Sequence, residues 1–265
     1  MRAYLTVARN MLMSTFTYRA HILFQILGSV FSVVVLWFLW RAIFDAAGTP
    51  TIRGMSFGQT FLYVALAAAL FVMMRSWVEW DIHWQVRSGD IIVHFFRPYS
   101  LVGIVFFNAL GGVAGNLLTI TIPSLVAIFL AFHAPVPGWF SLILFIPALV
   151  QAYLLSFLLD FFIGVTAFRT ESIWGLSATK EVIVLFLSGG AIPLAFFPDG
   201  VRDLLTVLPF ASMYNTPISL LAGGLSDPGV IAGRLALQSL WVVVLFLGVQ
   251  LYYRVTVKKL TVAGG

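Results

Sequence analysis

Asp160 is the one carboxylate well inside an apolar run of the sequence, nine residues before Arg169. Nine helical residues rise about 13 Å, which places this carboxylate deep enough in a membrane for its charge to be costly. An acid at such a depth is typical of a translocation pathway or a proton relay. A protonated or locally paired structural carboxylate is the alternative. The amides of Asn108 and Asn116 either line a pathway or bond neighbouring helices, and we favour the bonding role.

Other reactive side chains are scattered. The histidines lie at positions 21, 83, 94 and 133, without the spacing of metal ligands. Ser, Asp and His do not converge in any pattern that indicates a hydrolase. The chain contains no Cys, which excludes disulfides and thiolate metal sites. We therefore expect no catalytic residue, no metal site and no cofactor in this chain.

The main polar segment of the chain is residues 75–98, which hold six of the 25 Asp, Glu, Lys and Arg residues and two of the four His. Apolar sequence flanks it on both sides, so it connects two membrane spans. Gly89 divides it into two helical pieces. In the first piece, helical spacing places Glu79 and His83 on one face and Arg87 on another, beside two tryptophans.

The second helical piece of this segment carries a polar stripe. Asp90, His94 and Arg97 are spaced by four and three residues, with apolar side chains opposite them, and Pro98 ends the helix. A short helix with one apolar side in the membrane surface and a charged side in water suits a coupling element, which a soluble domain grips. An ordinary interfacial connection is the alternative.

Composition sets the class of protein. With 61% hydrophobic and 9% charged residues, the chain lies far below the roughly 25% charged residues of soluble domains. Its 265 residues suffice for about six spans of roughly 20 residues. Basic residues are spread along the connections, which argues against nucleic acid as a partner. We predict an all-α integral membrane protein with one membrane domain over residues 1–265, embedded in a lipid bilayer.

Six membrane spans are expected along the chain. Residues 1–18 are too polar to span and form an amphipathic interfacial helix, and Pro and Gly break 198–228 into short outer-face helices. The third apolar run, 99–132, is about 51 Å long as one helix, so either 99–107 lies along the interface or the helix bends at Pro123. The expected spans are 21–40, 58–74, part of 99–132, 139–168, a broken or re-entrant 182–197, and 230–253.

The distribution of Lys and Arg predicts the orientation. With the amino terminus in the cytoplasm, 11 of the 15 Lys and Arg residues fall in cytoplasmic segments and 4 in outer segments. This is a positive-inside bias. We expect both termini and the 75–98 segment on the cytoplasmic face of a prokaryotic inner membrane.

Several segments resemble a known family. Gly89-x-Ile91 followed by FFRPYS at 95–100 is similar to the glycine and Leu-Leu-Arg-Pro-Leu stretch between spans two and three of type-2 ABC exporter permeases. Phenylalanines at 95 and 96 replace the usual leucines and keep the apolar character. The segments that resemble a short six-span subgroup are FRTESIWGL (168–176), SGGAIPLAFFP (188–198), LPF (208–210) and the terminal Ala-Gly-Gly.

The resemblance implies a permease subunit that works with a separate ATP-binding subunit and a second permease, paralogous or identical. ATP and magnesium would then bind to that ATP-binding subunit. Gly89, Arg97 and Pro98 carry over as parts of the coupling element, and Asp90 and His94 join them through the polar stripe. Glu79 and Arg87 complete the expected contact with the ATPase.

Two further observations bear on this function. Leu187-Ser-Gly-Gly190 matches the start of the ABC ATPase signature, yet it lies in an apolar run, and the sequence contains no G-x-x-x-x-G-K-[ST] phosphate loop. The glycines are therefore expected to break or pack the fifth span. Gly111 and Gly115 form a G-x-x-x-G pattern that serves packing within the chain or between chains. A stand-alone secondary transporter or channel is the alternative function.

Overall fold

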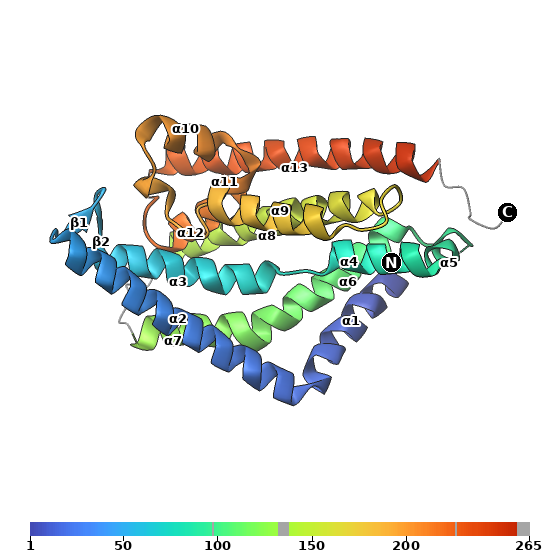
Figure 1. The fold of residues 1–265 in the computed structure, drawn as a ribbon, viewed down its shortest axis with the longest axis horizontal. Coiled ribbons are helices and arrows are strands. Elements are labelled where there is room, and N and C mark those ends of the chain that lie inside the picture. Colours follow the sequence, from blue (N-terminus) through green and yellow to red (C-terminus); the bar gives the residue numbers. More distant parts are fainter. Residues whose placement is uncertain (97, 132–137, 226, 259–265) are drawn as a thin grey trace.

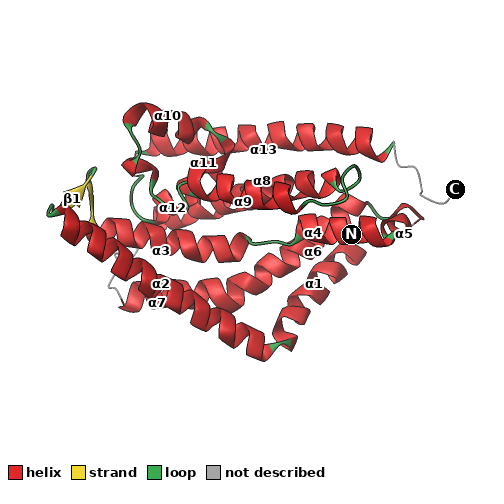
Figure 2. Ribbon diagram, in the orientation of Figure 1, coloured by secondary structure: helices red, strands yellow, loops and turns green. Residues whose placement is uncertain are grey.

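The computed structural model describes residues 1–96, 98–131, 138–225 and 227–258. Within these ranges the chain is almost entirely helical, and one short hairpin supplies the strands (Figure 2). The predicted all-α class is confirmed. The elements are α1 (Arg2–Thr17), α2 (Arg19–Ala47), β1 (Thr51–Ile52), β2 (Met55–Ser56), α3 (Phe57–Met74), α4 (Val78–Ser88), α5 (Ile91–Phe96), α6 (Leu101–Asn116), the π-helix η1 (Leu117–Thr121), α7 (Ile122–Ala131), α8 (Trp139–Thr166), α9 (Trp174–Leu187), the short helix η2 (Leu194–Phe196), α10 (Asp199–Val207), α11 (Pro209–Met213), α12 (Asn215–Leu221) and α13 (Pro228–Val257).

The long helices extend along the long axis of the molecule (Figure 1). α1 and α2 form a V that bends at Tyr18, and α3 lies in the core, with most of its side chains buried. The amino terminus, α4, α5 and the end of α13 gather at one end of the molecule, here called the α4 end. The β1–β2 hairpin and α10 lie at the opposite end, here called the hairpin end.

Five helical stretches are long and apolar enough to cross a membrane: Arg19–Ala47, Phe57–Ser88, Leu101–Leu130, Trp139–Thr166 and Pro228–Val257. The second of them contains α3 and α4, which are joined by the non-helical residues 75–77. These stretches cover the predicted first, second, third, fourth and sixth spans. Multiple apolar helices of this length make the chain a multi-pass membrane protein.

The predicted fifth span is the one whose bounds were wrong. α9 begins at Trp174 rather than at residue 182, and it ends at Leu187 in a turn at Gly189, whose φ is +81°. Its 14 residues rise about 21 Å, less than a hydrocarbon core of roughly 30 Å. The predicted break at the paired glycines is present. The start differs because Ser177 and Lys180, which precede position 182, are helical and face partners inside the protein.

Local signals fix the ends of several helices. Ser56 and Gln59 form a capping box at the start of α3, in which each side chain bonds the backbone of the other. Asp227 caps α13, and Pro228 takes the first helical position, where its missing N–H is not needed. Arg53 and Gly54 both have positive φ, as a two-residue hairpin turn requires. The predicted loop between the first two spans therefore contains a hairpin.

The third span is neither an interfacial segment at 99–107 nor a helix bent at Pro123 alone. Helix continues from Leu101 to Ala131, and η1 interrupts its α-helical pattern one turn before Pro123. Because Pro123 has no N–H to donate, the preceding turn is free to widen. Thr121 in this π-helix donates its hydroxyl to the carbonyl of Ala69 on α3, at 3.4 Å. The irregular turn therefore packs against the core helix.

The short helices expected at 198–228 are present, and two of them pack inside the protein. α11 and α12 contribute buried residues such as Met213, Ile218 and Leu220. They pack against α8. Gln238 of α13 donates to the carbonyl oxygens of Ser212 and Ala148, both at 2.8 Å. The buried amide of Gln238 therefore ties α13 to α11 and to α8.

α1 packs lengthwise along α6, and glycines of α6 make this possible. A methyl group on Gly115 would lie 2.6 Å from the hydroxyl oxygen of Thr15, and one on Gly111 would collide with the backbone carbonyl of Ala8. The G-x-x-x-G pattern of α6 thus serves packing within the chain. It holds the amino-terminal helix against the bundle.

Gly111→Ala is expected to lower stability by about 1–3 kcal/mol, because the methyl group meets rigid backbone and α1 must shift. Gly112→Ala is the matched control on the same helix, since its nearest neighbour is a flexible Met11 side chain at 3.7 Å. Thermal unfolding in detergent compares the two variants. Equal unfolding temperatures would contradict the close α1–α6 contact.

Candidate functional site

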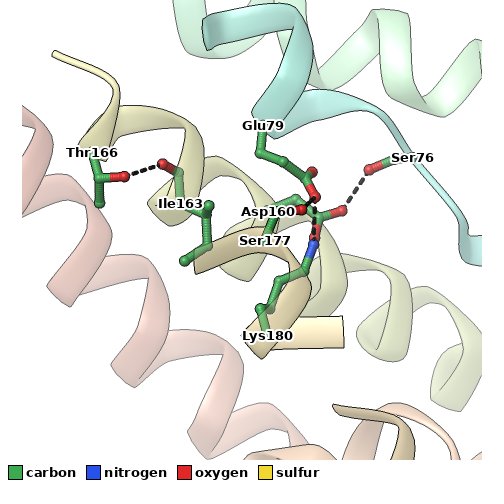
Figure 3. Close-up of polar contacts among 7 residues, drawn as sticks. All are labelled: Ser76, Glu79, Asp160, Ile163, Thr166, Ser177 and Lys180. Atoms are coloured by element: carbon green, nitrogen blue, oxygen red, sulfur yellow. Dashed lines mark hydrogen bonds and ion pairs between the residues drawn. The ribbon is translucent and has the colours of Figure 1, made fainter. Parts of the chain in front are cut away.

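A group of buried polar side chains joins three separate helices near the α4 end. The ammonium nitrogen of Lys180 lies 2.6 Å from a carboxylate oxygen of Glu79 and 2.6 Å from one of Asp160. Ser177 donates to Glu79 at 3.0 Å, and Ser76 donates to Asp160 at 2.5 Å. Figure 3 shows Lys180 between the two acids. We call these five residues the Lys180 cluster.

Each member of the Lys180 cluster comes from a defined element. Ser76 lies in the non-helical segment between α3 and α4, and Glu79 lies in the first turn of α4. Asp160 lies on α8, and Ser177 and Lys180 share one face of α9 because they are three residues apart. The cluster therefore ties the start of α4 to α8 and α9.

Close packing of α4 on α8 brings Glu79 and Asp160 together. Gly164 of α8 lies under α4, and a methyl group there would be 2.7 Å from the Ile82 side chain and 3.1 Å from the Cα of Glu79. Ile82 is completely buried at this contact. A glycine one turn along α8 from Asp160 thus lets the two helices approach.

The Lys180 cluster is shielded from solvent. The side chains of Glu79, Asp160 and Lys180 are 2%, 8% and 14% exposed. Buried charges are tolerated when they are paired and hydrogen-bonded, and the two serine hydroxyls provide bonds beyond the ion pairs. Removing one member of such a group is far more costly than replacing all of them by neutral residues.

Of the two alternatives for Asp160, the structure shows the locally paired carboxylate. One of its oxygens accepts from Lys180 and the other from Ser76. A small cavity of about 40 Å³ lies beside it, lined also by Phe71 and Tyr214. Two further acids lie near Asp160, since Glu79 faces it across Lys180 and Glu181 also lines the cavity.

The expected ATPase-contact residues separate into two groups. Glu79 was wrongly placed among the exposed contacts, because its side chain faces Lys180 and Ser177 and is buried. The face of α4 that carries Arg87 is exposed, as is Trp84, and Arg87 donates to the backbone carbonyl of Glu171 at 3.3 Å. The predicted division of α4 into two faces is correct, but Glu79 faces inward.

The second helical piece is present as α5. Gly89 ends α4 with φ of +81°, a left-handed conformation that glycine adopts without strain. Asp90 is exposed and accepts from Ser88 at 2.7 Å. His94 is half-buried, and Pro98 is exposed. Arg97 lies outside the described residues.

A groove of about 480 Å³ opens beside α4, between His83, Val86 and Arg87 on one side and residues 167–171 on the other. Arg169 in this groove lies over the ring of Tyr252, with its guanidinium carbon 5.3 Å from the ring centroid. The groove, α4 and α5 together form an exposed surface at the α4 end, where the charged Arg87 and Asp90 and the aromatic Trp84 and Phe96 are all exposed.

Residues 30–264 match the family model described as ABC-2 family transporter protein. The chain belongs to this family. It is therefore a type-2 ABC permease, the membrane component of an ABC transporter, in a family whose members associate with an ABC ATP-binding subunit that carries the ATPase. A search of curated proteins found no match to the sequence.

The two amides that were considered for a pathway differ in their contacts. Asn116 of the permease donates to the carbonyl oxygens of Val72 and Arg75, at 3.2 and 3.5 Å, and so caps the end of α3. This is the helix-bonding role that the sequence favoured. Asn108 is half-buried on α6. In the described part of the permease, no group of three or more His, Cys, Asp and Glu residues is placed to hold a metal ion.

Sequence reasoning did not connect Lys180 with Asp160. Lys180 was assigned to a cytoplasmic connection because polar residues precede the apolar run at 182. The three-residue spacing of Ser177 and Lys180, followed by that run, was the available signal. It places a hydroxyl and an ammonium on one helical face, which needs acidic partners when the helix is packed in a bundle.

Proposed function

We propose that this permease couples ATP hydrolysis by a separate nucleotide-binding subunit to the efflux of a substrate across the cytoplasmic membrane. The α4–α5 segment and the adjoining groove form its contact with that subunit, which binds ATP and magnesium. A second permease, paralogous or identical, completes the assembly. Both termini and the α4 end lie in the cytoplasm, and α9 with η2 forms the broken fifth of six spans.

The Lys180 cluster is the observation that carries this proposal. A coupling element must be accessible to a soluble partner and also attached to the spans that move. α4 meets both requirements, because one face carries the exposed Trp84 and Arg87 and the other is bonded through Glu79 to Lys180. A force applied to α4 therefore acts on α9 as well as on α8.

α9 is the span that is best suited to respond. It is short, it ends in the turn at Gly189, and the Gly189 backbone adopts the left-handed conformation. By contrast α8 continues unbroken from Trp139 to Thr166. We infer that ATP-driven movement of α4 tilts α9 relative to α8 and so changes access between the two membrane faces. The two states must differ in substrate affinity for this movement to drive export.

The pairing of Asp160 also bears on the alternative of a stand-alone secondary transporter. Such a transporter needs an intramembrane acid that exchanges a proton or ion with its substrate. Asp160 is instead held by Lys180 and Ser76. This supports a structural and coupling role for the acid.

Crosslinking tests the proposed contact surface, and the absence of Cys from the chain makes single-Cys variants unambiguous. Arg87→Cys and Asp90→Cys, labelled with a maleimide that carries a photoactivatable benzophenone, are expected to crosslink to the ATP-binding subunit in membranes of the native cells. Thr51→Cys in the hairpin, at the opposite end of the molecule, is the control. Crosslinking from position 51, or from neither 87 nor 90, would refute the assignment of the α4 end.

A further inference from the structure

A second cavity of the permease is lined in part by Phe71, which also lines the small cavity beside Asp160. It has a volume of about 360 Å³ and is lined by α2, α3, the third span, α9 and the turn after α9. Its α3 side includes Ala67, Ala68 and Ala69 together with the larger Val64, Phe71 and Val72. Small side chains here, with Gly190 and Ala191 opposite, leave the space open.

The lining of this cavity has no charge. Apart from hydroxyl groups of Ser29, Ser32 and Ser124, its side chains are apolar, and no Asp, Glu, Lys, Arg or His contributes to it. An ionic group at membrane depth needs a counter-charge or a polar partner. The cavity offers no counter-charge, which excludes a charged ligand group inside it.

The serine hydroxyls have already used their hydrogens. Ser29 donates to the carbonyl of Ile26 at 2.9 Å, so Ser124 is the donor in the 3.1 Å bond between Ser124 and Ser29. Ser32 donates to the carbonyl of Gly28 at 2.9 Å. Since a hydroxyl has one hydrogen, none of the three has one left to donate to a ligand, and only their oxygen lone pairs remain for polar contacts. The cavity therefore recognises shape and apolar surface.

We propose that this cavity binds an alkyl chain of the molecule that the permease exports, so that the substrate is an amphiphile with an uncharged hydrocarbon part. This inference rests on the proposed export function and names its substrate class. A hydrocarbon chain requires no hydrogen bond and no counter-charge, which matches the lining, and it enters from the surrounding lipid.

α9 connects this cavity with the coupling element. Leu185 of α9 lines the cavity, five residues after Lys180 in the same helix, a rise of about 7.5 Å. Movement of α4 acts on α9 through Glu79 and Lys180, and it therefore changes the wall of the cavity. Binding and release of the alkyl chain follow the nucleotide state of the ATP-binding subunit.

The test uses the purified complex in lipid nanodiscs and a long-chain alcohol with a diazirine in its chain. Photolabelled peptides are identified by mass spectrometry. Ala68→Phe, which fills the cavity, is expected to reduce labelling of the α3 and α9 peptides to background. Ala232→Phe on α13, an exposed position, is the matched control, and labelling of the α3 and α9 peptides is expected to be unchanged in it. Equal labelling of the cavity peptides in both variants would overturn the proposal.

A wild-type measurement keeps the test valid if Ala68→Phe does not fold. Labelling of the cavity peptides is expected to saturate, to be displaced by unlabelled long-chain alcohol, and to remain in the presence of short-chain alcohols. Labelling that increases linearly, without displacement, would overturn the binding site.

The alkyl chain in the cavity has two candidate sources, a transported substrate and a bulk membrane phospholipid. To distinguish them, labelling by a diazirine-bearing phospholipid is compared with and without ATP and vanadate. A transported chain is expected to leave the cavity in the vanadate-trapped complex. Phospholipid labelling that is equal with and without ATP and vanadate would overturn the substrate assignment. Co-purification of the ATP-binding subunit and ATPase activity are measured in the same samples. If they persist while cavity labelling fails, the substrate inference fails and the proposed export function stands.

Discussion

Lys180→Met is expected to lower the free energy of unfolding by about 3–5 kcal/mol, because it leaves two buried acids without their cation. Glu79 and Asp160 both place an oxygen 2.6 Å from the Lys180 nitrogen. With the ammonium removed, the two carboxylates face each other in a site that water reaches poorly. The loss is measured by titration with sodium dodecyl sulfate in mixed micelles, following unfolding by tryptophan fluorescence.

Two comparisons make this result specific to the Lys180 cluster. Lys258→Met removes a lysine at the exposed end of α13 and is expected to leave stability nearly unchanged. The triple variant Glu79→Gln, Asp160→Asn, Lys180→Met removes all three charges and is expected to recover most of the loss. If Lys180→Met were as stable as Lys258→Met, the buried ion pairs would not hold α4, α8 and α9 together.

The second large effect is expected in the folded triple variant. Its ATP-binding subunit should still hydrolyse ATP, but α9 should no longer respond, because the charged link from α4 is gone. The readout is the rate at which a maleimide labels Leu185→Cys, a unique thiol in this chain. With the cluster intact, ATP and vanadate are expected to change this rate by about 5- to 150-fold, the usual range of coupling between sites.

In the triple variant that nucleotide-dependent change is expected to disappear while ATPase activity remains. A matched control carries Leu185→Cys with Lys258→Met and should behave as the unchanged cluster does. A full nucleotide response in the triple variant would show that α4 moves α9 by some other route.

The apolar periodicity of the sequence predicted most of the fold because a membrane span is defined by length and hydrophobicity. The helices α2, α3, α8 and α13 lie where runs of apolar residues indicated them. α9 was misplaced because its first half is polar, and only tertiary partners make a polar helical segment suitable for the interior. The packing of α11 also depends on a distant residue, since Gln238 of α13 bonds the carbonyl of Ser212.

The candidate site was predictable only in part. Gly89 was expected to divide the polar segment into two helical pieces, and it does so with a φ of +81°, which depends only on local backbone conformation. Glu79 was assigned to the correct face of α4, but its burial depends on Lys180, which is 101 residues away in the sequence. Single-sequence patterns show which residues share a face. They do not show which distant helix face packs against it. The Lys180 cluster forms where the faces of three helices, α4, α8 and α9, pack together.

The most direct test of the account is purification of the tagged permease from its native cells in mild detergent. The co-purifying proteins are identified by mass spectrometry, and ATPase activity is assayed. We predict an ABC ATP-binding subunit at near-equal stoichiometry, together with a second permease or a second copy of this chain. Recovery of the permease alone and without ATPase activity, in several detergents, would contradict the proposed pump and return Asp160 to consideration as a proton-coupling acid.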